Sequence, residues 1–389
     1  MERFDVVVVG GGPAGATAAE TLAREGHAVL LLDRAGRIKP CGGAVPPRLI
    51  RDFAIPDSQI VARIRKARMI SPTAHHVDIP IENGYVGMVD REHFDEFLRT
   101  RATEAGAVRR AATFERVEHT DDGLTIVRYR DPEGHSLTVS TRLVIGADGA
   151  RSDVARQCVP GGDTIPYVIA YHEIVASPES AWDPDRCDVI YDGRTSPDFY
   201  GWVFPHGPCT SVGMGTGQRG FDLKAATKAL RVSAGLDRQR TIRREGAPIP
   251  LKPLKRWDNG RDVVLAGDAA GVVAPASGEG IYYAMVGGEE AARACAECLA
   301  TGDVRALRLA RKRFMKMHGR VFWVLGLLQK FWYKNDKRRE SFVKICEDVD
   351  VQRLTFESYM NKRLVRKKPL AHVRIFFKDL MHLAGFARS

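Results

Sequence analysis

A cysteine followed by two glycines is the first group in this chain whose type and position could support chemistry. Cys41 precedes Gly42, Gly43 and Ala44, in a loop that follows an apolar stretch. Adjacent glycines permit unusual backbone angles and let the chain approach a planar ring closely. The thiol could donate a proton, although thiols are weak acids, or it could simply pack against such a ring. Both interpretations stay open.

A row of aromatic residues forms the second candidate site. The segment from residue 197 to 205 contains Tyr200, Trp202 and Phe204, and the glycine-rich segment 212–215 follows. Because side chains alternate across a strand, the three rings are expected on one side. Such a wall would suit a long apolar substrate. A strand in the protein core would show the same pattern, so this alternative stays open too.

The first 33 residues indicate the scaffold that positions these groups. An apolar run at 6–9 leads into a glycine-rich turn, a helical pattern and a second apolar run that ends at an acid. Gly10 allows the tight turn, Gly12 lets the backbone approach a pyrophosphate, and Gly15 allows close helix–sheet packing. Asp33 is placed to accept from a ribose hydroxyl, and the helix N-terminus favours phosphate. The pattern predicts dinucleotide binding.

Two later segments specify the dinucleotide. The run 143–152 contains Asp148-Gly149, and the run 263–271 is a buried strand that enters a turn at Gly267-Asp268. Enzymes that use FAD, of the glutathione-reductase-like and hydroxylase-like groups, carry such elements, whereas enzymes that use only NAD do not need them. We therefore predict FAD. The expected cofactor-binding residues are Gly10, Gly12, Ala14, Gly15, Asp33, Arg34, Cys41, Gly42, Gly43, Ala44, Arg91, Asp148, Gly149, Gly267, Asp268, Gly278, Gly280 and Ile281.

Composition excludes several classes of protein. The longest apolar run, 321–328, is shorter than the roughly 20 residues of a membrane span. The N-terminus lacks a secretory signal, and seven cysteines without framework spacing favour the cytoplasm. Cys295 and Cys298 lie in an Ala-rich helical stretch, where packing is the favoured interpretation, and no metal site is expected.

The positive charge is concentrated at the C-terminal end. The chain has a formal net charge of +11, and residues 304–389 hold 22 Lys/Arg against 7 Asp/Glu. Large apolar residues alternate with these charges around 314–334 and again around 375–383. This mixture is typical of a helix that lies on an anionic membrane surface, although plain packing on the rest of the protein is the alternative. No nucleic-acid module is recognised.

We predict a mixed α/β fold in which a β-rich domain is inserted into a Rossmann-like FAD domain of the glutathione-reductase/hydroxylase type. The FAD domain is expected over 1–60, 90–160 and 255–302. An antiparallel β-sheet substrate domain is expected over 61–89 and 161–254, and a basic helical region over 303–389.

The aromatic segment resembles the signature Pro-x-x-Tyr-x-Trp-x-Phe-Pro of the geranylgeranyl reductase family. The pattern is complete at Pro197, Tyr200, Trp202, Phe204 and Pro205, and the Cys41 segment and the Asp268 segment match as well. The segments 341–346 and 350–359 look like the C-terminal region of the chlorophyll and bacteriochlorophyll members. The absence of a plant-type transit segment favours a bacterial enzyme.

The resemblance implies reduction of three of the four double bonds of a geranylgeranyl chain, carried on (bacterio)chlorophyll or as the diphosphate. It implies a hydride from reduced FAD, with Cys41, Tyr200 and Trp202 as catalytic candidates and Tyr200, Trp202, Phe204 and Pro205 as substrate contacts. NADPH or reduced ferredoxin would supply the electrons. Arg91 is expected at the cofactor because hydroxylase-like flavoproteins often place an arginine there. The enzyme is expected in the cytoplasm, at the cytoplasmic face of the photosynthetic membrane.

Two other functions compete with this interpretation. A hydroxylase-type flavin monooxygenase shares the three cofactor motifs, and oxygen consumption coupled to reductant would identify it. A membrane-docked flavin or pigment carrier would bind pigment without turnover. The Cys-Gly-Gly segment and the aromatic signature argue against both.

Overall fold

The computed structural model describes residues 1–34, 36, 38–82, 84–180, 182–353, 360 and 362. Within this part the chain forms two compact units. Unit 1 comprises Met1–Lys39, Arg91–Tyr167 and Pro248–Phe322, and unit 2 comprises Pro40–Asp90, Val168–Ala247 and the described residues from Trp323 onward. The first division thus falls after Lys39 and not at residue 60, and the segment after 302 is shared between the units. Most of the expected motif 350–359, and all of the apolar stretch 375–383, lie outside the described residues.

Unit 1 is built on a seven-stranded sheet in the order β8-β2-β1-β11-β10-β9, with β17 paired to β11. The strands β8, β2, β1, β11 and β17 pair in parallel, whereas β9, β10 and β11 pair antiparallel. The apolar runs seen in the sequence are the buried central strands, as parallel strands covered on both faces require. The strands are β1 (Arg3–Val9), β2 (Val29–Asp33), β8 (Val108–Ala111), β9 (Thr113–His119), β10 (Thr125–Arg130), β11 (Ser136–Gly146) and β17 (Val263–Leu265).

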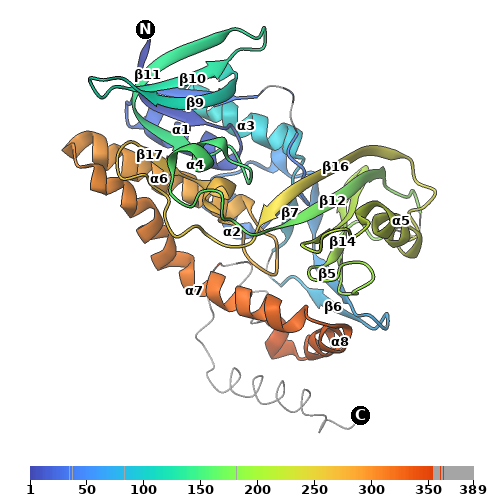
Figure 1. The fold of residues 1–389 in the computed structure, drawn as a ribbon. Helices are drawn as coiled ribbons and strands as arrows, with labels where there is room; N and C mark the ends of the chain where they lie inside the picture. The colour runs from blue at the N-terminus through green and yellow to red at the C-terminus, as the bar shows by residue number, and fades with distance from the viewer. Residues whose placement is uncertain are drawn as a thin grey trace. The chain divides into compact units, whose positions relative to one another are not determined.

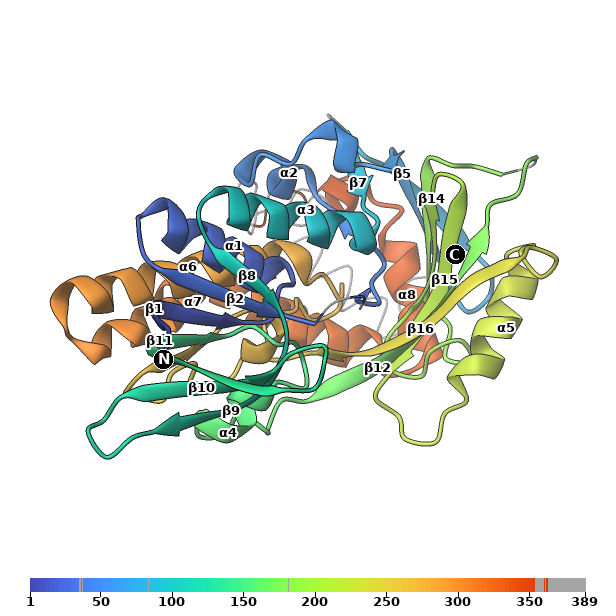
Figure 2. The same cartoon turned by 90° about the horizontal axis from the view of Figure 1, so that it is seen from above.

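Helices cover the parallel part of this sheet. The helix α1 packs against both α3 and α6, and Figure 2 shows α1 and α3 side by side over β1, β2 and β8. A Cβ at Gly288 would lie 2.1 Å from the carbonyl oxygen of Ala14, so α1 and α6 approach backbone to backbone. The helical elements are α1 (Pro13–Arg24), α3 (Arg91–Glu104), α4 (Asp153–Cys158), η2 (Gly267–Ala270), α6 (Ile281–Thr301), η3 (Val304–Leu307) and the start of α7 (Arg308–Trp332).

Unit 2 contains a second seven-stranded sheet, in the order β16-β12-β15-β14-β13-β5-β6, and a small sheet β3-β7-β4. The expected antiparallel pairing holds for β12 with β15, β15 with β14, β14 with β13 and β5 with β6, but β13 and β5 pair in parallel. The strands are β3 (Ala44–Val45), β4 (Ala62–Ile64), β5 (Lys66–Ile70), β6 (His76–Pro80), β7 (Val86–Met88), β12 (Tyr167–Ala176), β13 (Arg186–Ile190), β14 (Gly201–His206), β15 (Cys209–Thr216) and β16 (Thr241–Pro250).

Helices pack against the larger sheet in unit 2. On one face Leu230 of α5 (Leu223–Ser233) packs with Val175, Val203 and Val212. Figure 1 places α5 and α8 (Asp336–Ile345) beside this sheet, and α8 contacts β6. The remaining elements are α2 (Pro47–Asp52) and η1 (Asp57–Gln59). Among the described residues, none of the helices combines the length and the apolar character that crossing a bilayer requires.

Candidate functional site

Three segments that are far apart in the sequence meet at the carboxyl ends of the parallel strands in unit 1. A Cβ at Gly10, whose φ is +103°, would lie 2.4 Å from the carbonyl oxygen of Ala147 and 2.9 Å from Cα of Asp148. A Cβ at Gly267 would lie 2.7 Å from Cβ of Ala14. The glycine-rich turn is therefore held directly against both later motifs. Ligands of open α/β sheets bind at this edge.

Two of the helices that begin at this edge, α1 and α6, have no side-chain cap. The N-caps of α1 and α6 are Gly12 and Gly280, and neither helix has an acid in its first turn. By contrast, α4, α5 and α8 are capped by Ser152, Asp222 and Asn335. Free N–H groups and partial positive charge at an uncapped helix start are suited to phosphate oxygens.

Asp33 holds the glycine-rich turn in place. Its Oδ1 accepts a hydrogen bond of 3.1 Å from the backbone N–H of Gly11, and its Oδ2 lies 3.1 Å from Nη1 of Arg99. Arg99 also donates to the carbonyl oxygen of Gly11, at 3.2 Å. A carboxylate has about four acceptor positions, so these contacts leave room for a ribose hydroxyl. Arg99 was not predicted from the sequence.

The two later aspartates have different surroundings. Asp148 accepts from Ser152 Oγ, from Asp153 N at 2.7 Å and from Val154 N at 3.2 Å, and it thereby holds the start of α4. Burial raises the pKa of the Asp148 carboxyl. Asp268 forms an ion pair with Lys39 and lies beside the start of α6, since a Cβ at Gly280 would be 3.7 Å from its Oδ1.

The cradle in unit 1 fits an FAD molecule. Apart from its chain neighbours, no described residue has an atom within 4 Å of a Cβ placed at Gly12, so the backbone there faces open space, as a pyrophosphate requires. The other predicted residues are less informative. Ala14 lies in α1, Ile281 opens α6, Arg34 is exposed, and Gly149 and Gly278 have positive φ. Arg91 is buried and paired with Asp95 through two contacts of 2.7 Å.

The aromatic residues of unit 2 form one continuous face, as the alternation predicts. Ring centroids of Tyr200 and Trp202 are 6.1 Å apart, and those of Trp202 and Phe204 are 6.3 Å apart. His206 continues the row at the end of β14. We call Tyr200, Trp202, Phe204 and His206 the aromatic face. By strand alternation, Pro205 points to the opposite side of the sheet, so the structure does not place its side chain with the other predicted substrate contacts.

The Cys41 segment lies against this face. A Cβ at Gly42 would be 3.2 Å from the ring of Phe204, and a Cβ at Gly43 would be 2.5 Å from Nε2 of His206. Gly43 has a φ of +71°, and its N–H lies 3.4 Å from the Cys41 sulfur as a hydrogen-bond donor. The half-buried Cys41 and Ala44 lie on either side of these glycines. The two segments that the sequence singled out are thus adjacent.

The buried His206 should make the stability of the protein depend on pH. Burial lowers the pKa of His206 to about 4 from 6.5, while its Nδ1 bonds to the carbonyl oxygen of Phe204 at 2.9 Å. The unfolded chain therefore binds this proton more readily, and stability falls as the pH drops from about 6.5 to about 4. We expect a contribution of roughly 1–3 kcal/mol.

Urea unfolding of the wild type and of His206→Asn at several pH values would check this expectation. Asparagine keeps a donor near the position of Nδ1 and does not titrate, so the variant should lose part of the dependence between pH 6.5 and 4. Identical pH slopes for the two proteins would contradict the assignment. His135→Asn is a matched control, because its side chain is 73% exposed.

Comparison with known proteins adds the family. The sequence model described as "Lycopene cyclase protein" matches residues 5–375. A Rhodobacter capsulatus protein named geranylgeranyl diphosphate reductase is 60% identical over 98% of both chains. This chain belongs to the geranylgeranyl diphosphate reductase family.

Solved structures agree with the fold. A geranylgeranyl bacteriochlorophyll reductase-like protein from Thermoplasma acidophilum has a TM-score of 0.83 at 23% identity, covering 95% of this chain and 99% of its own. The myxobacterial halogenase CndH, described as FAD-dependent, has a TM-score of 0.67 at 19% identity, covering 100% and 98%. This chain therefore shares the fold of these proteins, and the residues of the cradle in unit 1 are consistent with FAD.

The C-terminal segment of this family member contributes to the aromatic face. The ring of Tyr191 is 6.1 Å from Tyr200, 5.5 Å from Tyr333 and 5.2 Å from Phe342. Burial raises the pKa values of Tyr191 and Tyr333. Tyr191 was expected in the substrate domain, whereas Tyr333 and Phe342 were expected in a separate basic helical region, for which packing on the rest of the protein was the alternative.

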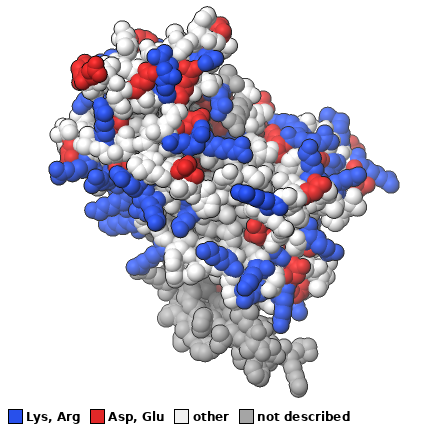
Figure 3. All heavy atoms as spheres, in the orientation of Figure 1, with Lys and Arg blue, Asp and Glu red and all other residues white. Residues whose placement is uncertain are grey.

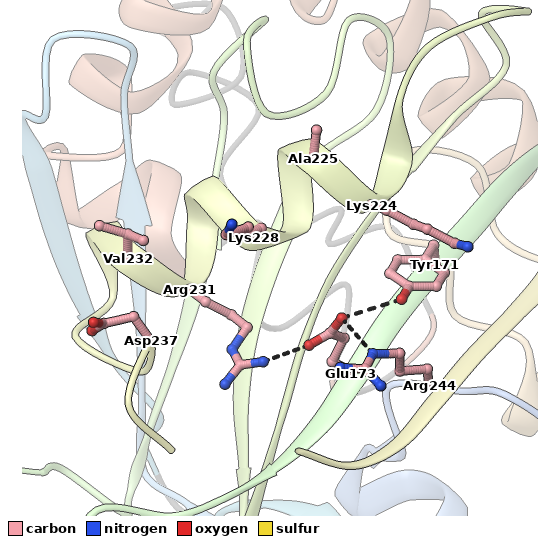
Figure 4. A pocket seen from close by; sticks show the side chains of 9 residues that line it. All are labelled: Tyr171, Glu173, Lys224, Ala225, Lys228, Arg231, Val232, Asp237 and Arg244. Atoms are coloured by element: carbon pink, nitrogen blue, oxygen red, sulfur yellow. Dashed lines mark hydrogen bonds and ion pairs between the residues drawn. The ribbon is translucent and has the colours of Figure 1, made fainter. Parts of the chain in front are cut away.

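A polar pocket lies on the opposite face of the same sheet (Figure 4). Its volume is about 610 Å³. The carboxylate of Glu173 lies 2.6 Å from Arg231 and 3.2 Å from Arg244, and Tyr171 donates to it at 3.2 Å. Tyr171 and Glu173 alternate with His172, which points to the aromatic face. None of the predicted site residues lines this pocket, and its ion pairs connect α5 and β16 to β12.

Proposed function

We propose that this chain is an FAD-dependent reductase that adds hydrogen, stepwise, to three of the four double bonds of a geranylgeranyl chain and so forms a phytyl chain. The observation that carries the proposal is the 60% identity, over nearly the full length, to a protein named geranylgeranyl diphosphate reductase. The apolar, ring-lined face of unit 2 supports it, because an isoprenoid offers only apolar surface and double bonds to its binding site.

Several of the predicted residues would hold the cofactor. The uncapped starts of α1 and α6 would take the pyrophosphate and the flavin end, and the open position at Gly12 would leave room for the phosphate oxygens. Asp33 would accept from the adenosine ribose and Asp268 from the ribityl chain. Bound FAD, once reduced, supplies a hydride. Arg91 supports the cofactor through its buried pair with Asp95.

The substrate sets the demands on the remaining residues. An isolated trisubstituted alkene has no carbonyl to stabilise a carbanion, so hydride addition to one carbon must be coupled to protonation of the other. We assign the proton to the Cys41 thiol, directly or through Tyr200 or water. The negative ring faces of Tyr200 and Trp202 stabilise positive charge that develops on the protonated carbon. Phe204 completes the wall.

We expect Cys41→Ala to lower turnover by about 100-fold, the usual scale of a lost general acid, while FAD binding and the rate of flavin reduction stay close to those of the wild type. Cys41→Ser should recover part of the loss, because the hydroxyl can relay a proton. Stopped-flow measurement of flavin reduction and reoxidation separates the two steps. Full turnover in Cys41→Ala would remove Cys41 as the acid. Cys209→Ala, another half-buried cysteine of unit 2, is the control.

We further propose that the protein works at the cytoplasmic face of an anionic membrane. Lys312, Lys316, Arg320, Trp323 and Leu327 follow one another at spacings of three or four residues along α7, which places them on one face of the helix. Trp323 is 68% exposed and Leu327 is 48% exposed.

Further cations surround the start of the same helix. Figure 3 shows Lys and Arg atoms gathered over the N-terminal half of α7, on the left of the view. A hollow of about 650 Å³ there is lined by Lys255, Arg256, Asp258, Arg308, Arg311, Lys312 and Met315. Exposed tryptophan and leucine beside lysine and arginine is the composition of an interfacial helix.

The double variant Trp323→Ser/Leu327→Ser is expected to bind phosphatidylglycerol-containing vesicles about tenfold more weakly than the wild type, because it loses buried apolar area at the interface. Both proteins should release from the vesicles at high salt, and vesicles of phosphatidylcholine alone should bind neither well. Co-sedimentation measures this. Val232→Ser, at a 59% exposed position on α5, serves as the control. Equal binding of all three proteins would contradict docking through α7.

The activity test is anaerobic incubation with geranylgeranyl-bacteriochlorophyll or with geranylgeranyl diphosphate, followed by product mass. We expect stepwise gains of two hydrogens, with NADPH as donor. Turnover with dithionite but not with NADPH would indicate that NADPH is not the electron donor, and reduced ferredoxin would be tested next. Reductant-dependent oxygen consumption with a gain of oxygen in the product would favour the monooxygenase instead.

A further inference from the structure

A buried chain of polar side chains lies behind the aromatic face in unit 2. The indole Nε1 of Trp202 donates to Ser211 Oγ at 3.0 Å, and Ser211 Oγ lies 2.9 Å from Nδ1 of His172. Nε2 of His172 lies 2.9 Å from Oε2 of Glu245, whose Oε1 is 3.0 Å from Nε of Arg243. Ser211 is fully buried, His172 is 2% exposed and Trp202 is 5% exposed.

The hydrogen-bonding capacity of these groups gives the chain one direction. An indole can only donate, and a serine hydroxyl has one hydrogen and two acceptor positions. The carboxylate of Glu245 can only accept, so the ring proton of a neutral His172 sits on Nε2, which faces it. Nδ1 then accepts from the hydroxyl of Ser211, which itself accepts from Trp202. Burial opposes ionisation of Glu245, but His172 and Arg243 outweigh it and lower the pKa of that carboxyl.

A glycine on the neighbouring strand makes room for this arrangement. Gly213 of β15 is paired with both Trp202 and His172. A Cβ at Gly213 would lie 2.3 Å from Cβ of His172 and 2.6 Å from Cζ2 of Trp202. Glycine weakens the interior of a strand, and here its absence of a side chain lets the two rings lie over the same position of the sheet, with centroids 6.1 Å apart.

We infer that Ser211, His172 and Glu245 are positioning residues that fix the orientation of the Trp202 ring, and through it the shape of the surface that receives each successive double bond. This rests on the proposed function. A wall of phenyl rings could slide and rotate, whereas an indole tied at Nε1 has one orientation. An enzyme that reduces several double bonds of one chain must present the same surface to alkenes that differ in their distance from the chain end.

The first test reads the hydrogen bond itself and does not depend on activity. The chain has five tryptophans, so 15N-indole spectra should show five signals, and Trp202→Phe identifies the one from Trp202. Ser211→Ala should shift this signal toward that of a free indole, whereas Ser211→Thr, which keeps the hydroxyl, should restore it. Thr210→Val is the matched control, because Thr210 is equally buried in β15 but bonds to Ser177. An unshifted Trp202 signal in Ser211→Ala would show that Trp202 is not held by Ser211 and would overturn the inference.

The second test measures function in the FAD-loaded protein. Ser211→Ala and His172→Phe should raise KM for the isoprenoid about three- to tenfold, the scale of one hydrogen bond, and should release more partly reduced product. Thr210→Val should change neither. A shifted indole signal with wild-type KM and product pattern would show that the chain is structural only. If the wild type itself reduces no geranylgeranyl substrate, the proposed function fails and the positioning role fails with it. The indole spectra would still show whether Trp202 is hydrogen-bonded to Ser211.

Discussion

Replacing Gly12 by alanine should leave a folded protein that binds FAD about a hundredfold more weakly, a loss of about 2.7 kcal/mol. The backbone of Gly12 has an ordinary φ of −74°, and in the described part of the chain an added Cβ would meet no atom within 4 Å beyond the neighbouring residues. The methyl group is therefore tolerated by the fold and occupies only the space in front of the uncapped start of α1. We expect the free energy of unfolding of the apoprotein to change by less than about 1 kcal/mol. Titration of apoprotein with FAD, followed by flavin fluorescence, measures the affinity.

A second glycine of the same unit provides the control for this prediction. A Cβ at Gly287, inside α6, would lie 3.5 Å from the backbone nitrogen of Gly267 and 3.7 Å from Val272, at ordinary packing distances. Gly287→Ala should therefore retain FAD and gain slightly in helix stability. If Gly12→Ala bound FAD as tightly as Gly287→Ala, the pyrophosphate would not lie at this turn.

Gly43→Ala should destabilise the protein by more than about 2 kcal/mol and reduce turnover by more than tenfold. Its φ of +71° costs an alanine about 1–2 kcal/mol. In addition, a Cβ would lie 2.5 Å from Nε2 of His206 and 2.5 Å from the carbonyl oxygen of Val89, which belongs to the backbone and cannot rotate away. The Cys41 segment would have to leave the aromatic face. Thermal unfolding and steady-state turnover measure both effects.

A variant of the adjacent glycine distinguishes a loss of stability from a loss of substrate binding. A Cβ at Gly42 would be 3.2 Å and 3.3 Å from two carbons of the Phe204 ring, which can shift by a few tenths of an ångström. The unfolding temperature of Gly42→Ala should therefore stay close to that of the wild type, while KM for the isoprenoid rises. Equal losses of stability in Gly42→Ala and Gly43→Ala would contradict the described contact with His206.

Local patterns in the sequence predicted the elements that hold the cofactor. The run before Gly10 and the run that ends at Asp33 are β1 and β2, and the alternation at Tyr200 and Trp202 correctly places the rings on one side. These patterns involve residues that are close in the chain, where strand and helix periods determine direction. The meeting of the three cofactor motifs followed from their known arrangement in FAD enzymes.

Contacts between distant strands were beyond the reach of these patterns. His172 and Glu245 carry no motif, and they meet only because β12, β15 and β16 are neighbours in one sheet. The sequence shows a glycine at 213, but not why a glycine is needed there. The need arises because the rings of His172 and Trp202 pack over this position, which depends on the register of the strands. The parallel pairing of β13 with β5 joins residues from two separate segments of the chain, which no local period reveals.

The most direct test of the central claim is a single turnover without oxygen. The FAD-loaded protein is reduced with one equivalent of dithionite, mixed with a geranylgeranyl substrate, and followed at once by flavin absorbance and by product mass. The proposed function predicts that the flavin is reoxidised in step with a gain of two hydrogens per flavin, and that Gly12→Ala without FAD gives neither signal. A flavin that stays reduced in the presence of both the pigment-esterified and the diphosphate substrate, with no change in product mass, would contradict it.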